Sequence, residues 1–460
     1  MKKRSAERPS TDDLAIDARP TKELFIDMLT RDVALIPAII DLADNSTDGA
    51  RRSRADESWN GLQVKIEAKP NKFVIADNCG GIPVDVARRY AFRFGRSSDA
   101  ATTGGEVGRF GVGMKRGLFK LGREFHIRST TETSQFDVSI DVDDWEKETE
   151  WQFGFDKDPI EDSNFDESDQ GTVITVTKLH APVKEHFHET GFLDDLRREL
   201  TARLEQSILK GLAVTVNAVA LKAHVRTLVG DKDLAPAKKS FKLRGPTGGA
   251  VEIDLWCGLG KPASSKAARA ESGWYVFCNG RMLLEADKTE ATCWGVEDDD
   301  SIPAYHPQYN GFRGYAYLDA EDAADLPWNT TKTSLDTDHP VYRRVRQEMI
   351  AIARPVVNYF NKKKEENDAL AEAGEDAKGK LQTLLDLAEV VPLADIKARA
   401  VFKPPSVSIT KKVRHGLQRI QFDCPAEKAN RVKRSLGVSS WRQVGEEVFD
   451  YYYNAELKDE

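Results

Sequence analysis

The sequence contains little cysteine, and its five cysteines are scattered along the chain. They include no C-x-x-C pair; they are Cys79, Cys257, Cys278, Cys293 and Cys424. A zinc module needs closely spaced cysteine or histidine ligands, and a small secreted domain needs paired cysteines. The spacing therefore argues against both classes and favours a reducing compartment.

Long hydrophobic runs are also absent. No uninterrupted apolar stretch approaches the roughly 20 residues that a membrane-spanning helix needs. The first seven residues, Met1-Lys-Lys-Arg-Ser-Ala-Glu7, lack the apolar core of a signal peptide. We therefore expect a cytoplasmic protein with no membrane partner.

Charge of one sign is not in excess. The 460 residues include 75 acidic and 67 basic side chains, which gives a formal net charge of −8. This balance excludes a chain that is basic throughout and binds nucleic acid everywhere, although a local basic region lies near the C-terminus. The length is sufficient for two to four domains.

The most informative segment is Asp41-Leu-Ala-Asp-Asn-Ser-Thr-Asp48. On a helix, Asp41, Asn45 and Asp48 lie at i, i+4 and i+7 and so share one face. The preceding residues are strongly apolar, which predicts a largely buried helix. Buried carboxylates are costly unless a cation with a phosphate, or a web of hydrogen bonds, compensates them. The segment therefore predicts a nucleotide-binding protein.

Two further segments carry binding chemistry. Asp77 ends a predicted strand and is followed by glycines, which suits recognition of a base by its amino group and ring nitrogen. In Gly108-Arg-Phe-Gly-Val-Gly-Met-Lys115, three glycines lead into a predicted helix, where backbone N–H groups and a lysine bind phosphate. Each segment alone is more typical of a turn, and neither a P-loop nor a dinucleotide fingerprint fits.

The surrounding pattern predicts one mostly antiparallel sheet covered by helices, an α+β layer. It consists of a helix over 21–49, strands over 62–68, 72–76 and 171–176, and a long helix over 192–212. A second α/β pattern begins near Leu221, with strands over 250–256, 274–278 and 314–318 and a helix over 339–360.

In this order, the three segments resemble the N, G1 and G2 boxes of the GHKL ATPases. This superfamily includes gyrase B, heat-shock protein 90 chaperones, histidine kinases and MutL. Residues 108–122 look most like the microrchidia (MORC) branch, in which a lysine follows the last glycine. The resemblance covers roughly residues 21–360. It implies a Bergerat-type ATP-binding α/β sandwich with ATP and Mg²⁺ as ligands.

The resemblance also implies a role for each matching residue. Asn45 is the expected Mg²⁺ ligand, Asp77 the adenine-binding carboxylate, and Asp48 a support of the pocket. Residues 95–107 are the expected ATP lid. The remaining expected ATP contacts are Gly81, Gly108, Gly111, Gly113, Met114, Lys115 and Thr172.

Two positions depart from the family pattern. Asp41 takes the place of the glutamate that usually acts as general base, and its side chain is one methylene shorter. We therefore expect a catalytic carboxylate but slow hydrolysis. Cys79 stands where the first glycine box normally has a glycine, and we interpret it as a small buried hydrophobe.

The second α/β pattern resembles the ribosomal-protein-S5-like transducer domain of the GHKL clamps, which histidine kinases lack. In those clamps a loop lysine reaches the γ-phosphate. Lys332, within Leu326-Pro-Trp-Asn-Thr-Thr-Lys-Thr-Ser-Leu-Asp336, matches that lysine. The resemblance therefore makes Lys332 the second catalytic residue beside Asp41.

The last residues form a small basic module. An alternating run over 418–422, a helix opened by Pro425 and a capping box at Ser440 and Gln443 resemble a ribbon–helix–helix fold. DNA binding and simple dimerisation both remain open for it. The expected domains are a flexible arm 1–20, an ATP-binding domain 21–221, a transducer 222–362, an exposed helical connector 363–402 and the module 403–460.

These features together predict a Mg-ATP-dependent ATPase that works as a nucleotide-gated homodimeric clamp on DNA or in a DNA-associated complex. Two alternatives remain open. One is a chaperone-like or scaffold ATPase that acts on a protein partner. The other is an ATP-binding switch with little hydrolysis, for which the short side chain of Asp41 is the reason.

Overall fold

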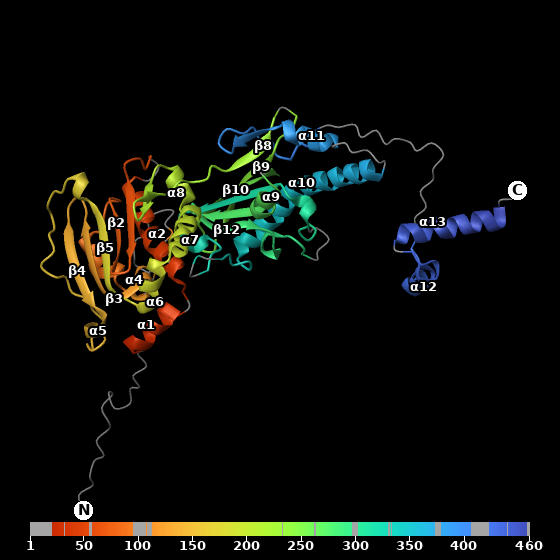
Figure 1. The fold of residues 1–460 in the computed structure, drawn as a ribbon. Coiled ribbons are helices and arrows are strands. Elements are labelled where there is room, and N and C mark those ends of the chain that lie inside the picture. The colour runs from red at the N-terminus through yellow and green to blue at the C-terminus, as the bar shows by residue number, and fades with distance from the viewer. Residues whose placement is uncertain are drawn as a thin grey trace, which may run out of the picture. The chain divides into compact units, whose positions relative to one another are not determined.

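The chain forms two compact units, Met1–Val407 and Ser408–Glu460, in the computed structural model (Figure 1). The structure describes residues 21–31, 33–54, 58–94, 107, 113–231, 233–261, 264–296, 302–329, 332, 334–372, 379–405, 423–438 and 440–457. The predicted arm 1–20, the glycines Gly108 and Gly111 and the predicted strand 418–422 lie outside these residues. No described helix is long and apolar enough to cross a bilayer.

The first half of the larger unit contains a seven-stranded sheet. Its order is β4-β3-β5-β2-β1-β6-β7, and only the β1–β6 pair is parallel. The mostly antiparallel sheet is therefore confirmed. The strands are β1 (Gln63–Lys69), β2 (Lys72–Asp77), β3 (Gly122–Thr130), β4 (Gln135–Asp141), β5 (Gly171–Leu179), β6 (Ala213–Val216) and β7 (Val219–Ala220).

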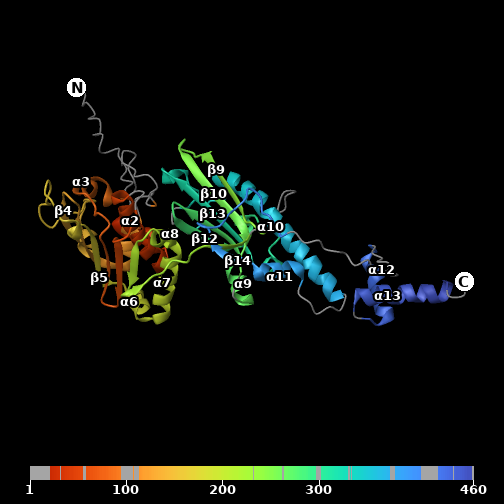
Figure 2. The same ribbon diagram turned by 90° about the horizontal axis from the view of Figure 1, so that it is seen from above.

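Helices lie along one side of this sheet, where Figure 1 places α2, α4, α6 and α7 and Figure 2 also places α2, α6 and α7. Their apolar side chains join those of the strands in one core. The helices of the first half are α1 (Lys22–Arg31), α2 (Leu35–Ser53), α3 (Val84–Val86), α4 (Gly113–Leu121), α5 (Val142–Trp145), α6 (Ala181–His188), α7 (Thr190–Arg203) and α8 (Glu205–Leu209).

Two predicted helices of this half are each divided in the structure. The helix expected over 21–49 is α1 and α2, because Ala34 is extended and Pro37 falls in the first turn of α2. Proline has no N–H to donate, so it fits a first turn but not a helix interior. The helix expected over 192–212 is α7 and α8, which meet at Leu204.

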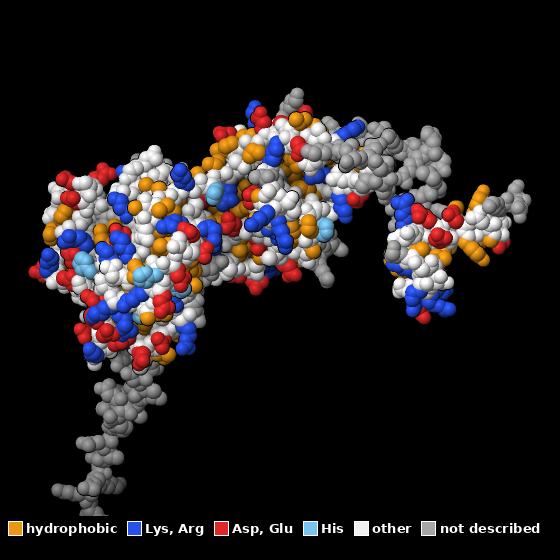
Figure 3. Space-filling model, viewed as in Figure 1, with side chains coloured by type: hydrophobic (Ala, Val, Ile, Leu, Met, Phe, Trp, Pro, Cys, Tyr) orange, Lys and Arg blue, Asp and Glu red, His pale blue; other side chains and the backbone are white. Residues whose placement is uncertain are grey.

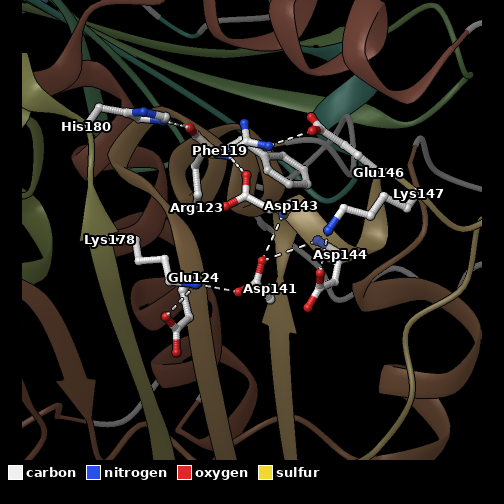
Figure 4. A network of polar contacts seen from close by, with 10 residues as sticks. All are labelled: Phe119, Arg123, Glu124, Asp141, Asp143, Asp144, Glu146, Lys147, Lys178 and His180. Carbon is white, nitrogen blue, oxygen red and sulfur yellow. Dashed lines mark hydrogen bonds and ion pairs between the residues drawn. The ribbon is translucent and has the colours of Figure 1, made fainter.

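An exposed polar network closes the end of β3, β4 and β5 (Figure 4). Asp141 caps α5 by accepting N–H bonds from Asp143 and Asp144, at 2.9 and 3.3 Å, and pairs with Lys178. Arg123 pairs with Asp143 and with Glu146. Exposed ion pairs contribute little to the free energy of unfolding. This network therefore orients α5 but adds little to stability.

The second half of the larger unit contains a five-stranded sheet with its own core. Its order is β12-β11-β13-β10-β9, and only the β11–β13 pair is parallel. Helix α10 (Pro340–Glu372) packs on this sheet. The strands are β9 (Ala237–Arg244), β10 (Ala250–Leu259), β11 (Gly273–Cys278), β12 (Arg281–Asp287) and β13 (Phe312–Ala320), and a short helix, α9 (Ser265–Glu271), precedes β11.

Residues 379–402 differ from the predicted exposed connector. Helix α11 (Lys380–Leu387) buries Leu381 and Leu385 in the second core, one helical turn apart. Strand β14 (Glu389–Pro392) then pairs with β8 (Thr227–Gly230). The expected exposure is wrong here because two leucines at i and i+4 bury this helix face despite the many charged residues around them.

The smaller unit contains two helices that begin as predicted. Pro425 precedes α12 (Ala426–Leu436), and Gly437 ends it in the left-handed region at φ +67°. Helix α13 (Trp441–Tyr452) starts with the expected capping box, since Ser440 Oγ accepts from Gln443 N at 3.2 Å and Gln443 Oε1 accepts from Ser440 N at 3.2 Å.

Close packing of α4 on α2 gives a prediction for stability. A Cβ on Gly117 would lie 2.9 Å from both Ala38 O and Leu42 Cγ. Gly117→Val should therefore lower the free energy of unfolding by about 2 kcal/mol or more, measured by denaturant unfolding. Gly191→Val is the matched control, because a Cβ on Gly191 meets no atom within 4 Å. Equal stability of the two variants would contradict the close packing.

Candidate functional site

Asp77 ends β2, the central strand of the first sheet, and three donors hold its carboxylate. Ser46 Oγ donates to Oδ2 at 2.6 Å, Cys79 N donates to Oδ1 at 2.9 Å, and Thr172 N donates to Oδ1 at 3.3 Å. Burial raises the pKa of Asp77, and the three hydrogen bonds oppose this rise. The carboxylate is thus fixed in orientation at a strand end.

Two glycines let the backbone pass closely around Asp77. Gly81 has φ +70°, and a Cβ there would lie 2.2 Å from Thr130 O. Gly171 has φ +142°, and a Cβ there would lie 1.9 Å from Asp77 O. Any larger residue would push these strand ends apart, so the chain requires glycine at both positions.

Cys79 behaves as the small buried hydrophobe that we expected. Its side chain is buried in the first core, and burial raises the pKa of its thiol. A Cβ on Gly49 would lie 2.7 Å from Cys79 O, so α2 approaches this loop closely. The cysteine side chain, which takes the place of a glycine in the family pattern, therefore packs within the core.

The acidic face of α2 is buried, as its sequence predicts, and it includes Asp44 in addition to Asp41 and Asp48. Asp48 Oδ1 accepts from Val107 N at 2.8 Å and lies 3.3 Å from Arg51 Nη1. Asp48 is therefore linked to the segment that precedes the glycine-rich run.

Asp41 is paired with a cation on the neighbouring helix. Arg116 Nη2 donates to Asp41 Oδ2, and both side chains are buried. Asp41 Oδ1 has no hydrogen-bond partner among the described residues. A Cβ on Gly113 would lie 3.5 Å from Asp41, so the start of α4 passes beside this carboxylate. One oxygen of Asp41 is therefore held by Arg116, while the other lies 4.0 Å from Arg281 Nη1.

Two cations from the second half reach Asp44. Arg281 pairs with Asp44 Oδ2, and Lys332 Nζ lies 3.5 Å from the same oxygen. Burial lowers the pKa of Arg281 to about 10 and that of Lys332 to about 8. Lys332 also has φ +52°, a strained value for a lysine, and such strain is typical of functional sites.

Met114 and Lys115 directly precede Arg116 in sequence, but their side chains make other contacts. Lys115 Nζ donates to Ala91 O at 2.9 Å, and burial lowers its pKa to about 7. Met114 packs in the first core. The structure thus places Asp41, Asp48 and Lys332 around one acidic cluster, and Asp77, Gly81 and Thr172 around a second point on α2.

Unsatisfied polar atoms lie close together on α2. Asn45 Nδ2, Asp41 Oδ1 and Asp44 Oδ1 are buried and have no hydrogen-bond partner among the described residues. Buried polar atoms are normally paired, so this set fits a polar ligand. The described residues contain no metal cluster of three or more His, Cys, Asp or Glu side chains. The oxygen atoms fit Mg²⁺ if phosphate and water complete its ligands, as Mg²⁺ prefers.

The comparison with protein families agrees with this geometry. Residues 33–172 match the model of the family described as histidine kinase-, DNA gyrase B-, and HSP90-like ATPase. The match begins before α2 and ends in β5, so it includes the acidic face of α2, Asp77 and Thr172. The comparison with curated protein sequences gave no match. This part of the chain is therefore similar to GHKL ATPase domains, which indicates ATP binding, and the first sheet is compatible with that fold.

Ser46, Arg116 and Arg281 contribute to the site, although the sequence motifs did not identify them. Ser46 lies within the acidic segment and Arg116 directly follows Lys115. Arg281 follows the two-residue turn Asn279-Gly280 between β11 and β12. Nothing in local spacing shows which carboxylate each of these side chains meets.

The hydrogen bond from Ser46 to Asp77 generates a prediction. Ser46→Ala should weaken binding of a non-hydrolysable ATP analogue about tenfold, because a hydrogen bond to a charged group is lost. Thr47→Ala is the matched control, since among the described residues Thr47 Oγ1 bonds only Asp44 O in its own helix, at 2.8 Å. Titration calorimetry measures both affinities, and unchanged affinity in Ser46→Ala would contradict the role of this contact.

Proposed function

We propose that the chain is a Mg²⁺-dependent ATPase whose second half senses the γ-phosphate through Lys332. The observation that carries this proposal is the burial of Lys332 against the acidic face of α2, with Nζ 3.5 Å from Asp44 Oδ2. A lysine that reaches this face from another sheet makes closure of the two halves depend on the nucleotide.

Each residue has a distinct task in this proposal. Asp77 accepts a hydrogen bond from the adenine amino group, while Gly81 and Thr172 shape the space around the base. Asn45 holds Mg²⁺, which neutralises phosphate charge when bound. Asp41 accepts the proton of the attacking water. The phosphates are bound by Lys115 and by the backbone of Gly108, Gly111, Gly113 and Met114.

Asp41 is also the reason to propose slow turnover. Its side chain is one methylene shorter than the glutamate of the family pattern, and Arg116 holds one of its oxygens. A shorter and restrained base reaches the water less directly, so proton transfer is less efficient. An ATP-binding switch with little hydrolysis remains the second candidate for the same reason.

The finer assignments follow from the resemblance and extend this proposal. Residues 21–221 form the ATP-binding domain, residues 222–362 an S5-like transducer domain, and the chain belongs to the MORC-like branch. Two copies close as a clamp when ATP binds, in a cytoplasmic setting. A chaperone-like or scaffold ATPase that acts on a protein partner is the alternative to a clamp on DNA.

The smaller unit supports DNA as the partner. Basic side chains gather on α12, as Figure 3 shows; they are Lys428, Arg431, Lys433 and Arg434. No described side chain of α12 or α13 is buried. We assign residues 403–460 a ribbon–helix–helix-like role, in which two copies pair and contact DNA phosphates through these side chains.

Lys332 gives the direct test of the nucleotide proposal. Lys332→Ala should abolish hydrolysis but leave ADP affinity nearly intact, because the lysine contacts only the γ-phosphate. In the wild type, kcat/KM should fall as the pH rises above about 8, since Lys332 carries its charge only below that pKa. Lys239→Ala is the control, because this exposed lysine pairs with Glu348. Equal turnover in Lys332→Ala and the wild type would rule out the proposed role.

DNA binding is tested separately with the full chain. Duplex DNA should bind at low salt, stimulate ATP hydrolysis, and dissociate as salt rises, because phosphate contacts release counterions. Replacing Arg431 and Lys433 by alanine should weaken binding and reduce the salt slope by about two, whereas Lys147→Ala, in the turn after α5, should change neither. Absence of binding at low salt would favour the protein-partner alternative.

A further inference from the structure

The turn between β11 and β12 is held in one conformation. Asn279 and Gly280 have φ angles of +47° and +76°, as in a tight two-residue hairpin turn. The Asn279 side chain accepts from Ala320 N at 2.9 Å and donates to Ala320 O at 3.1 Å. Arg51 of α2 donates to Asn279 O at 3.1 Å. Arg281, the first residue of β12, is therefore fixed where the two halves meet.

Arg281 brings a buried positive charge to the acidic face of α2. Its side chain is only 3% exposed, and Nη1 pairs with Asp44 Oδ2 and lies 4.0 Å from Asp41 Oδ1. Lys332 Nζ lies 3.5 Å from the same oxygen of Asp44. Two buried cations thus share one carboxylate, although one cation would be enough to neutralise it.

We propose that Arg281 is a positioning residue that keeps Asp44 neutralised when Lys332 leaves it for the γ-phosphate. This inference rests on the proposed function, in which Lys332 contacts the nucleotide. Without Arg281, Lys332 would be the sole basic partner of Asp44 among the described residues. Its departure would then leave a buried carboxylate unpaired, which is strongly unfavourable. With Arg281 present, Asp44 keeps a partner whether Lys332 contacts it or the phosphate.

The electrostatics of Lys332 agree with this exchange. Burial lowers the pKa of Lys332, attraction to Asp41 opposes that shift, and repulsion by Arg281 adds to it. Arg281 therefore repels the charged form of Lys332 at this position. A lysine held weakly by a carboxylate transfers to a triphosphate more readily than one that is the sole partner of a buried charge.

The test measures how well the full chain distinguishes a non-hydrolysable ATP analogue from ADP. The dissociation constant of ADP divided by that of the analogue reports the γ-phosphate contact. Measuring this ratio needs no turnover. Arg281→Gln should reduce this ratio about tenfold or more, the effect expected for one charge-assisted contact, because Lys332 stays with Asp44. Adding Asp44→Asn should restore the ratio, because the carboxylate that retains Lys332 is removed.

A purely structural role of Arg281 predicts a different pattern. In that case Arg281→Gln would lower thermal stability, and the double variant with Asp44→Asn would not recover the ratio. Either that failure to recover or a wild-type ratio in Arg281→Gln overturns the proposal. Arg281→Lys keeps the charge and should hold the ratio within about threefold of wild type, so a tenfold loss there also overturns it.

Arg313→Gln is the matched control. Arg313 is buried in β13 and pairs with Glu271, so its loss also removes a buried arginine from the second sheet. Arg313→Gln should leave the ratio unchanged. If this variant also lost the ratio, the loss in Arg281→Gln would reflect reduced stability alone.

If the wild type does not distinguish the two nucleotides, the proposed function fails. If Lys332→Ala loses the distinction while Arg281→Gln keeps it, only the role of Arg281 fails.

Discussion

Burial of the carboxylates on α2 is the constraint on which the site depends. Asp41, Asp44 and Asp48 lie on a helix that is covered on most of its surface. Buried carboxylates are stable only when cations or hydrogen bonds compensate them. The compensation for Asp41 comes from the neighbouring helix α4, and that for Asp44 comes from the second half. The acidic face therefore joins parts of the chain that share no local pattern.

Helix α2 also links the two ends of the candidate site. Ser46 holds Asp77 at the centre of the first sheet, while Asp44, two residues earlier, meets the cations of the second half. The strand-end carboxylate and the ion pairs with the second half are thus linked through one helix.

Much of the local structure follows from short patterns in the sequence. The alternation over 62–68 and 72–76 predicts β1 and β2, and the capping box at Ser440 predicts the start of α13. The missed features have a different origin. The break between α1 and α2 was masked by continuous apolar periodicity, and α11 was masked by its charged surroundings. In the first place Pro37 limits the helix, and in the second Leu381 and Leu385 form a short apolar face that packs in the second core.

Short sequence patterns were enough to predict the acidic face of α2, the end of β2 at Asp77 and the glycines that follow it. These features depend only on spacings within one or two helical turns or strands. Only the tertiary structure decided which cation meets which carboxylate. Arg116 is 75 residues from Asp41, and Lys332 is 288 residues from Asp44. The first pair joins two helices of the first half and the second pair joins the two halves, and no periodicity along the chain encodes either contact. The long-range ion pairs therefore depend on the tertiary packing.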